Sequence, residues 1–514
     1  MKKALLTASS ALLLMAAHAQ TPEDILRYSY YPQHGSARSI AIGGAMGSLG
    51  GDISATFVNP AGLGLYKTRE LVLSPGLALN NNKAAYRGTN ATANKSGFDL
   101  GTSGIVLGYK SDYSRWTSSA FSVGITQTAN FNNFVSYRGQ NNYSSLSEQF
   151  VEEFSNSGLT IDAALNNSGF AFGTAPALYS YLVDTFTVNG VTQVKALPEF
   201  LLQKGIALNQ EKSIDTRGGI YELALGFASN MNDRFYIGGS LGIPIVSYDR
   251  YTHYRESDPS GDNDNNFNYF EYNDKLTTKG FGLNLKLGTI FKPSEFLRLG
   301  LAIHTPTYYT LTDRESSDLT TDLEGYADPV SVSSSTFIDG GIGETKYTAL
   351  SPWRVIASGS YVFREASDVR AQKGFLTADI EYVGYPGSSF RADGETVTSE
   401  DQQYYDDMKQ VIKSYYKSAM NFRLGGELKF NTIMVRAGGA YYGNPYKDSQ
   451  LKSNLVQLSG GLGYRNHGVF IDLTYAHIMN KDVNFPYRLS DKDNTFSQLK
   501  NTRGNLLLTV GFKI

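Results

Sequence analysis

Hydrophobic and polar residues alternate along most of the chain, which is the pattern of strands that separate two environments. In the last strand, one side would carry Leu506, Leu508, Val510, Phe512 and Ile514, and the other Leu507, Thr509, Gly511 and Lys513. Successive strand side chains point to opposite faces, so the first set would face lipid and the second a lumen. Similar alternation occurs near 68–80, 100–110, 117–134, 216–229, 234–250, 277–292, 296–311, 347–363, 373–385, 418–430, 433–442, 455–465, 468–478 and 503–514.

These segments are connected by stretches that alternate between short and long. The short ones are 111–115, 230–233, 293–295, 364–372, 431–432 and 466–468, and the long ones are 81–99, 135–215, 251–276, 312–346, 386–417, 443–454 and 479–502. Transmembrane barrels have short periplasmic turns, long outer loops and an even number of strands. The sequence therefore predicts an all-β fold, a 14-stranded antiparallel transmembrane β-barrel. Helical spacing in "SLSEQFVEEF" and "ALPEFLLQKGIAL" predicts small helices in the longest outer loop.

The N-terminus carries an export signal. Lys2 and Lys3 precede an apolar run, and Ala17-His18-Ala19 forms a cleavage site, so residues 1–19 are interpreted as a signal peptide. No later stretch is long and apolar enough for a transmembrane helix. The chain has 35 Tyr, 28 Phe, 52 Gly and no Cys, which excludes a disulfide framework and suits a barrel in the outer membrane of a Gram-negative bacterium. A formal net charge of −2 gives no indication of nucleic-acid binding.

Residues 20–65 precede the first strand and contain "GSARSIAIGGAMGSLGGDISATFVNPAGLG". The segment is too long for a tail, too poor in charge for a disordered linker and too rich in glycine for an ordinary helix. We expect it to pack inside the barrel as a plug, with residues 66–514 forming the barrel.

The stretch "GSARSIAIGGAMGSLGGDISATFVNPAGL" resembles the N-terminal hatch signature of the FadL/TodX family of outer-membrane transporters for long-chain fatty acids and hydrocarbons. Further similarities are "FNNFVSYRG", "LRLGLAIHTPTYYTL", "LSPWRVIASGSYVF" and "VRAGGAYYGNPY". The resemblance implies a monomeric barrel that binds a hydrophobic ligand in its lumen, shifts its hatch and releases the ligand sideways where the third strand kinks. In this chain "TANFNNF" is the candidate irregularity.

The resemblance places the family's Asn-Pro-Ala motif on the hatch, where this chain has Asn59, Pro60 and Ala61. We expect the hatch or gate residues to be Gly43, Gly44, Asn59, Pro60, Ala61 and Gly62. A plain turn explains the same residues locally, because proline fixes φ and biases the preceding residue toward extended geometry. The expected partners are hydrophobic small molecules, outer-membrane lipids including lipopolysaccharide, and the barrel-assembly machinery, which reads an apolar final strand.

Two sets of residues are candidates for ligand binding. The alternation of inward and outward positions along the strands predicts a set of charged side chains that face the lumen. They are Lys286, Arg354, Asp379, Glu381, Arg423, Glu427, Arg436 and Asp472. They either brace the lumen as paired charges, or Arg423 or Arg436 meets a ligand carboxylate. Aromatic residues of the long loop either collect ligand in a groove or pack; they are Phe150, Phe154, Phe170 and Phe172.

Motifs of catalysis are weak. Gly238 to Gly242 matches G-x-S-x-G, but an alternating strand contains it, whereas the nucleophile elbow needs a strand-to-helix turn. Ser414 to Lys417 matches S-x-x-K without its companion motifs, and the six histidines are dispersed. We therefore expect no enzyme, cofactor or metal site. The alternative to a transporter is a structural, adhesive or general porin-type barrel.

Overall fold

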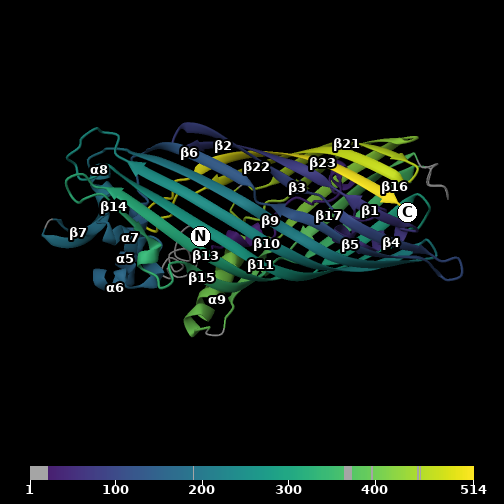
Figure 1. Ribbon diagram of the computed structural model, residues 1–514, viewed down its shortest axis with the longest axis horizontal. Coiled ribbons are helices and arrows are strands. Elements are labelled where there is room, and N and C mark those ends of the chain that lie inside the picture. Colours follow the sequence, from purple (N-terminus) through teal and green to yellow (C-terminus); the bar gives the residue numbers. More distant parts are fainter. Residues whose placement is uncertain (1–20, 189, 364–372, 395–396, 449–450, 452) are drawn as a thin grey trace.

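The protein forms one closed antiparallel barrel of fourteen strands in a computed structural model, which describes residues 21–188, 190–363, 373–394, 397–448, 451 and 453–514 (Figure 1). The ring closes where β23 pairs with β1 and β2, for example at Glu70↔Lys513 and Gly76↔Leu507. The predicted fold is therefore confirmed. The signal peptide 1–19 and the predicted turn 364–372 lie outside the described residues.

Several wall strands consist of two segments separated by a short break. In ring order the wall is β1 (Arg69–Leu73) with β2 (Pro75–Tyr86), β3 (Thr89–Leu100) with β4 (Ser103–Lys110), β5 (Trp116–Asn130) with β6 (Asn133–Asn141), β9 (Leu208–Met231), β10 (Phe235–Ser257), β11 (Tyr269–Phe291), β12 (Leu297–His304) with β13 (Tyr308–Asp322), β15 (Gly343–Leu350) with β16 (Arg354–Phe363), β17 (Gly374–Val383), β19 (Ala419–Phe430), β20 (Ile433–Tyr442), β21 (Leu455–Asn466), β22 (Val469–Asn484) and β23 (Ser497–Lys513). In the same sheet, β18 (Ser389–Ala392) follows β17 and pairs with β15, and β14 (Val330–Ser333) pairs with the outer end of β13. A separate two-stranded sheet consists of β7 (Val183–Val188) and β8 (Val191–Ala196).

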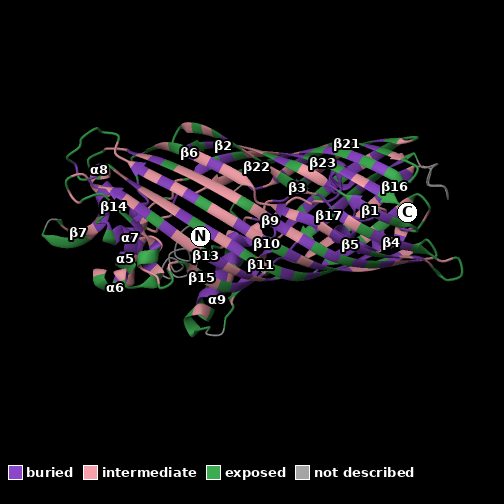
Figure 2. Cartoon of the chain, viewed as in Figure 1, coloured by how far each residue is buried: buried purple, intermediate pink, exposed green. Residues whose placement is uncertain are grey.

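The predicted alternation of lipid-facing and lumen-facing residues is confirmed. Leu506, Leu508 and Phe512 are exposed, whereas Leu507 and Thr509 between them are buried. Figure 2 shows the resulting alternation of exposed and buried residues along the strands. Exposed leucine, isoleucine and phenylalanine side chains surround the wall, as expected for a surface in contact with hydrocarbon. None of the described helices is both long enough and apolar enough to cross a membrane.

The strands continue farther at the long-loop end than the sequence pattern predicted. The predicted loop 81–99 is wrong, because β2 and β3 continue as a hairpin to a turn at Arg87-Gly88, where both residues have positive φ. Likewise β9, β10 and β11 extend well past their predicted outer ends. Beyond the bilayer both faces of a strand contact water, so the apolar alternation disappears while the backbone ladder continues.

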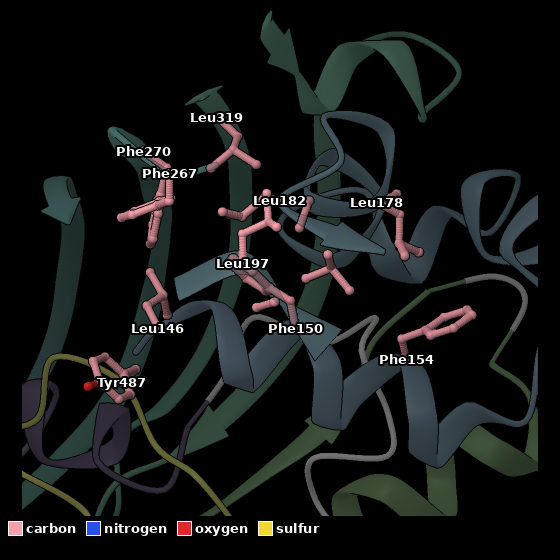
Figure 3. Packing of buried hydrophobic residues seen from close by; sticks show 14 of the residues in the cluster. Leu146, Phe150, Phe154, Leu178, Leu182, Leu197, Phe267, Phe270, Leu319 and Tyr487 are labelled. Atoms are coloured by element: carbon pink, nitrogen blue, oxygen red, sulfur yellow. The ribbon is translucent and has the colours of Figure 1, made fainter. Parts of the chain in front are cut away.

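Helices gather at the long-loop end, opposite the C-terminus (Figure 1). The predicted loop helices correspond to α5 (Ser147–Ser157) and α8 (Leu197–Gln203), joined there by α6 (Ile161–Leu165), η2 (Ser168–Phe170), α7 (Thr174–Tyr179) and η3 (Ser334–Thr336). The helix α9 (Ser399–Tyr415), which was not predicted, and η5 (Tyr385–Gly387) lie in the 384–418 connection. Together the loops form a cap with its own hydrophobic core (Figure 3).

Residues 21–66 lie within the ring of strands. They form α2 (Asp24–Arg27), α3 (Ala37–Ala41), α4 (Ala55–Val58) and η1 (Pro60–Leu65). Helix α3 contacts β20 to β23, while η1 contacts β5, β9, β10 and β11 on another side of the ring. Nearly every residue from 35 to 64 is buried. Because this segment packs against several parts of the wall, it fills the half of the lumen nearest the short turns.

Candidate ligand cavity and wall gap

The N-terminal segment is held by wall side chains that satisfy its backbone. Buried carbonyl groups need hydrogen-bond partners, and a segment with so little regular structure cannot supply them itself. Wall donors do so at three carbonyls: Ser240 Oγ donates to Thr56 O at 2.7 Å, Arg298 Nη1 to Leu49 O at 2.7 Å, and Thr474 Oγ1 to Ala37 O at 2.7 Å. These bonds fix the segment to three different strands.

Glycines on the inner face of the wall make room for this segment. A Cβ at Gly438 would lie 2.2 Å from the carbonyl carbon of Ile42, and one at Gly300 would lie 2.3 Å from Gly47 O. Similar overlaps would arise at Gly238, Gly288 and Gly425. Any side chain at these positions would push the backbones apart, so their glycines are a packing requirement. Gly238 of the G-x-S-x-G match thus has a structural explanation.

Asn59 connects the segment to the wall. Its Oδ1 accepts from Ala61 N at 3.1 Å, and its Nδ2 donates to Gly47 O at 2.6 Å and Thr289 O at 3.1 Å. The side chain is 1% exposed. Pro60 opens η1 as its first residue, and Ala61 and Gly62 continue it.

Gly43 and Gly44 are residues of the segment that lie close to the wall. Their φ values are +70° and +78°, and a Cβ at Gly43 would lie 2.6 Å from Gly439 O. Left-handed backbone and the lack of space both require glycine there. All six predicted gate residues are therefore packed in this contact region, and their motion stays a prediction.

The predicted lumen charges form ion pairs beneath and around the segment. Arg436 donates to Glu427 Oε2 and Asp472 Oδ1, each at 2.6 Å, and Arg423 Nη1 donates to Glu381 Oε2 at 3.0 Å. Arg423 and Arg436 are each 2% exposed. The geometry favours the bracing interpretation, since both arginines already hold carboxylates of the chain and neither lines the cavity described next. Their role toward a ligand stays untested.

A cavity of about 690 Å³ lies above the plug, toward the cap. Its floor comes from residues between 21 and 34 and from Ile40, and its walls come from β2, the junction of β5 and β6, β9, β10 and β21 to β23. This volume is in the range of small-molecule sites. Tyr31 belongs to the lining, and burial raises the pKa of its hydroxyl, so it stays a neutral hydrogen-bonding group.

The strand ladder of the wall is interrupted beside this cavity, at the third strand. β4 pairs with β5 from Ser103↔Ile125 to Lys110↔Ser118. Nearer the cap, β3, which belongs to the same wall strand as β4, forms a described ladder with β2 on one side and none on the other. The third strand is interrupted at Phe131 and Asn132, after a register shift at Gln127/Ala129. Opposite the shift, β9 carries Gly218, whose φ is +102°. The break falls within "TANFNNF", the irregularity predicted from sequence.

Side chains replace the missing ladder. Asn80 Nδ2 donates to Asn132 O at 2.5 Å, and Asn82 Nδ2 donates to Phe134 O at 2.6 Å. Because Asn80 and Asn82 point to the lumen side of β2, the segment β6 lies over the inner face of β2 and β3, in contact with both and without a described ladder to either. The gap is therefore bridged by side chains, which can separate without breaking a strand ladder.

The phenylalanines proposed as a collecting groove belong to the core of the cap. Phe150, Phe154 and Phe170 are buried in one cluster with residues of α7, α8 and β11 (Figure 3). Phe172 is partly buried, and its backbone carbonyl accepts from Tyr272 Oη at 2.7 Å. This placement favours the packing interpretation of these residues.

The G-x-S-x-G match, a weak motif in the sequence, lies in an unbroken strand. The G-x-S-x-G stretch lies inside β10, in continuous ladders with β9 and β11 from Gly238 to Gly242. No group of three or more His, Cys, Asp or Glu side chains suited to a metal ion occurs among the described residues.

The asparagines that line the cavity were missed by sequence reasoning. Asn82 was placed in the predicted loop 81–99, and Asn480 and Asn501 lie beyond the predicted ends of their strands, whereas Asn80 and Asn505 lay within predicted strands without being assigned a role. Their shared lumen parity, with asparagine at alternate positions, was the signal available in the sequence.

Comparison with known proteins gives a match at the level of fold. The chain is similar to a solved Pseudomonas aeruginosa FadL homologue, with a TM-score of 0.54 and 13% identity over 93% of this chain and 98% of that one. It is also similar to the Pseudomonas putida toluene transporter TodX, with a TM-score of 0.51 and 13% identity over 94% and 99%. No protein-family model and no curated protein matches. The chain therefore has the fold of the FadL and TodX barrels.

Proposed function

We propose that the protein carries hydrophobic or amphiphilic molecules inward through the outer membrane of a Gram-negative bacterium. The ligand enters at the capped end, occupies the 690 Å³ cavity and leaves sideways between β3 and β6. The observation that carries the proposal is the unpaired edge of β3 beside the cavity lining at residues 127–133. The solved neighbours of this fold, named as a fatty-acid-transporter homologue and a toluene transporter, support the same interpretation.

The sideways route has a physical reason. Burying a methylene group is worth about 0.8 kcal/mol, so an apolar molecule gains by passing directly from the wall into hydrocarbon. The N-terminal segment fills the lumen below the cavity, which disfavours a general porin. Binding, orientation and a movable barrier suffice for this task, so transport needs no catalytic group. We regard Gly43, Gly44 and Asn59 to Gly62 as that barrier, and the protein as a monomer.

A disulfide across the gap tests the route. A Cβ at Gly97 would lie 3.2 Å from the Cβ of Asn132, close to the separation of about 3.8 Å in disulfides. The chain has no cysteine, so Gly97→Cys with Asn132→Cys introduces the only thiols. We expect the oxidised pair to lose uptake of radiolabelled oleate and dodecane by cells, and reduction to restore it.

The matched control is Asn81→Cys with Asn94→Cys, which joins β2 and β3 where they are already paired. Its oxidation should leave uptake unchanged. Full uptake by the oxidised Gly97–Asn132 pair would exclude the sideways route. Heat-dependent mobility on denaturing gels verifies that each barrel is folded.

A further inference from the structure

The lining of the cavity carries polar atoms that have no hydrogen-bond partner within the described chain. Six buried side-chain atoms of the lining are in this state: His34 Nδ1, Gln127 Nε2, Arg250 Nε, Gln457 Nε2, Asn480 Oδ1 and Asn501 Oδ1. Gln127 is 1% exposed and Gln457 is 2% exposed. A buried polar group without a partner costs about 1–3 kcal/mol, so this set points to a ligand that supplies the partners.

These atoms include both donors and acceptors. The amide nitrogens of Gln127 and Gln457 can donate, whereas the amide oxygens of Asn480 and Asn501 can accept. Hydroxyl groups both donate and accept, and so do amides, whereas a hydrocarbon does neither. The lining therefore fits a ligand with several such groups.

The charges of the cavity disfavour an anion. Each of the four arginines in the lining is paired with a carboxylate: Arg27 with Asp24, Arg250 with Asp274 at 2.8 Å, Arg488 with Glu23 at 2.8 Å, and Arg503 with Asp99 at 3.5 Å. Asp482 also lines the cavity and has no ion-pair partner among the described residues. A ligand carboxylate would meet this negative charge, and each arginine of the lining already has a carboxylate of the chain beside it.

An apolar stripe completes the lining. Ile40, Leu455, Ala476 and Ile478 lie together on α3, β21 and β22. The polar side chains of Asn80, Asn82, Asn501 and Asn505 lie next to them on β2 and β23. The apolar stripe thus borders directly on amide side chains, because Asn480 lies opposite Leu455 and Gln457 lies opposite Ile478.

We propose that this cavity binds a neutral amphiphile, an apolar chain joined to a group with several hydroxyls or amides, in preference to a fatty acid anion or a plain hydrocarbon. The proposal rests on the transport function above and specifies its substrate class. The apolar chain would contact the stripe around Ile478, and the polar group would contact Asn480, Asn501 and the unpartnered glutamines.

The test compares three probes that share one alkyl chain: decyl maltoside, decanoate and decanol. Their binding to the full-length protein in lipid nanodiscs is measured by titration calorimetry, with protein-free nanodiscs subtracted. We expect decyl maltoside to bind at least about tenfold more tightly than the other two. Equal or tighter binding of decanoate or decanol would overturn this inference and leave the transport function standing, whereas failure of all three to bind would reject both.

Variants locate the site. Asn480→Leu with Asn501→Leu should weaken decyl maltoside by about tenfold or more, because two hydrogen-bonding groups are lost, and should leave decanol unchanged. The control Asn81→Leu changes an asparagine on the outward face of β2 and should have no effect. Should the folding of the double variant fail, Gln457→Leu serves in its place. Unchanged maltoside binding in a folded variant would contradict the assignment.

Discussion

The two halves of the lumen differ in the residues that fill or line them. Near the short turns, backbone meets backbone at glycines, and buried charges are paired, as at Arg436 with Glu427 and Asp472. Toward the cap, asparagine and glutamine side chains surround a cavity and several of their atoms lack partners. The comparison teaches that one barrel can be filled and tightly packed over one half of its length and hollow, with a polar lining, over the other.

The largest effect should come from breaking the charge network of the filled half. Arg436→Met leaves Glu427 and Asp472 buried without their shared cation, which should lower the free energy of unfolding by about 3–5 kcal/mol. Arg314→Met, at an exposed pair with Glu344, should cost less than about 1 kcal/mol. Urea unfolding in lipid vesicles measures both. Equal losses of unfolding free energy in the two variants would mean that the buried ion pairs of the filled half contribute no more to stability than the exposed pair.

A smaller but still large effect is expected from filling the space between backbones. Gly438→Ala places a methyl group 2.2 Å from Ile42, and such overpacking should cost about 1–3 kcal/mol. At Gly460 the nearest atom would be 3.7 Å away, so Gly460→Ala should be nearly neutral. The measurement is the temperature at which the folded band disappears on denaturing gels. Similar temperatures for the two variants would refute the close approach.

Next in size is the loss of a single buried side chain from the plug. Asn59→Ala removes three hydrogen bonds and should cost about 1–3 kcal/mol, most of it as faster hydrogen exchange in residues 47–62. Asn466→Ala, in an exposed turn, is its control. Unaltered exchange across this segment would show that Asn59 does not hold it in place.

The smallest effect on stability should arise from the same substitution in the cavity half. Asn82→Ala removes bonds to Asn133 Oδ1 and Phe134 O, both at 2.6 Å, in a place with room for water. We expect a loss of about 1 kcal/mol or less, together with faster hydrogen exchange in β6. A loss as large as that of Asn59→Ala would remove the contrast between the two halves.

Much of the wall could be predicted because contact with the bilayer imposes an alternation of apolar and polar residues along each strand. Val469, Ile471, Leu473 and Tyr475 alternate with inward residues such as Asp472 since one face of β22 contacts lipid. Where strands extend past the bilayer this constraint ends, so the β2–β3 hairpin was interpreted as a loop. Helix α9 was missed although Thr398 and Asp401 form a capping box and Tyr404, Met408 and Ile412 share its buried face.

The site was less predictable than the wall. The alternation of residues along each strand identified the charged residues that face the lumen. Which of them form ion pairs depends on which strands lie close together in the ring, as for Arg436 of β20 and Asp472 of β22 on either side of β21. The role of the wall glycines depends on where the N-terminal segment passes, which no local pattern encodes. The cavity arises from residues of seven wall strands and the plug, so only the assembled ring brings them together.

The contact between Ile42 and the glycines at 425 and 438 also fixes the height of the plug along the barrel axis. The plug contacts β5, β9, β10 and β11 through η1 and β20 to β23 through α3, so its contacts span the ring. Because backbone lies against backbone at these glycines, the plug cannot slide along the lumen without first losing contact with the wall.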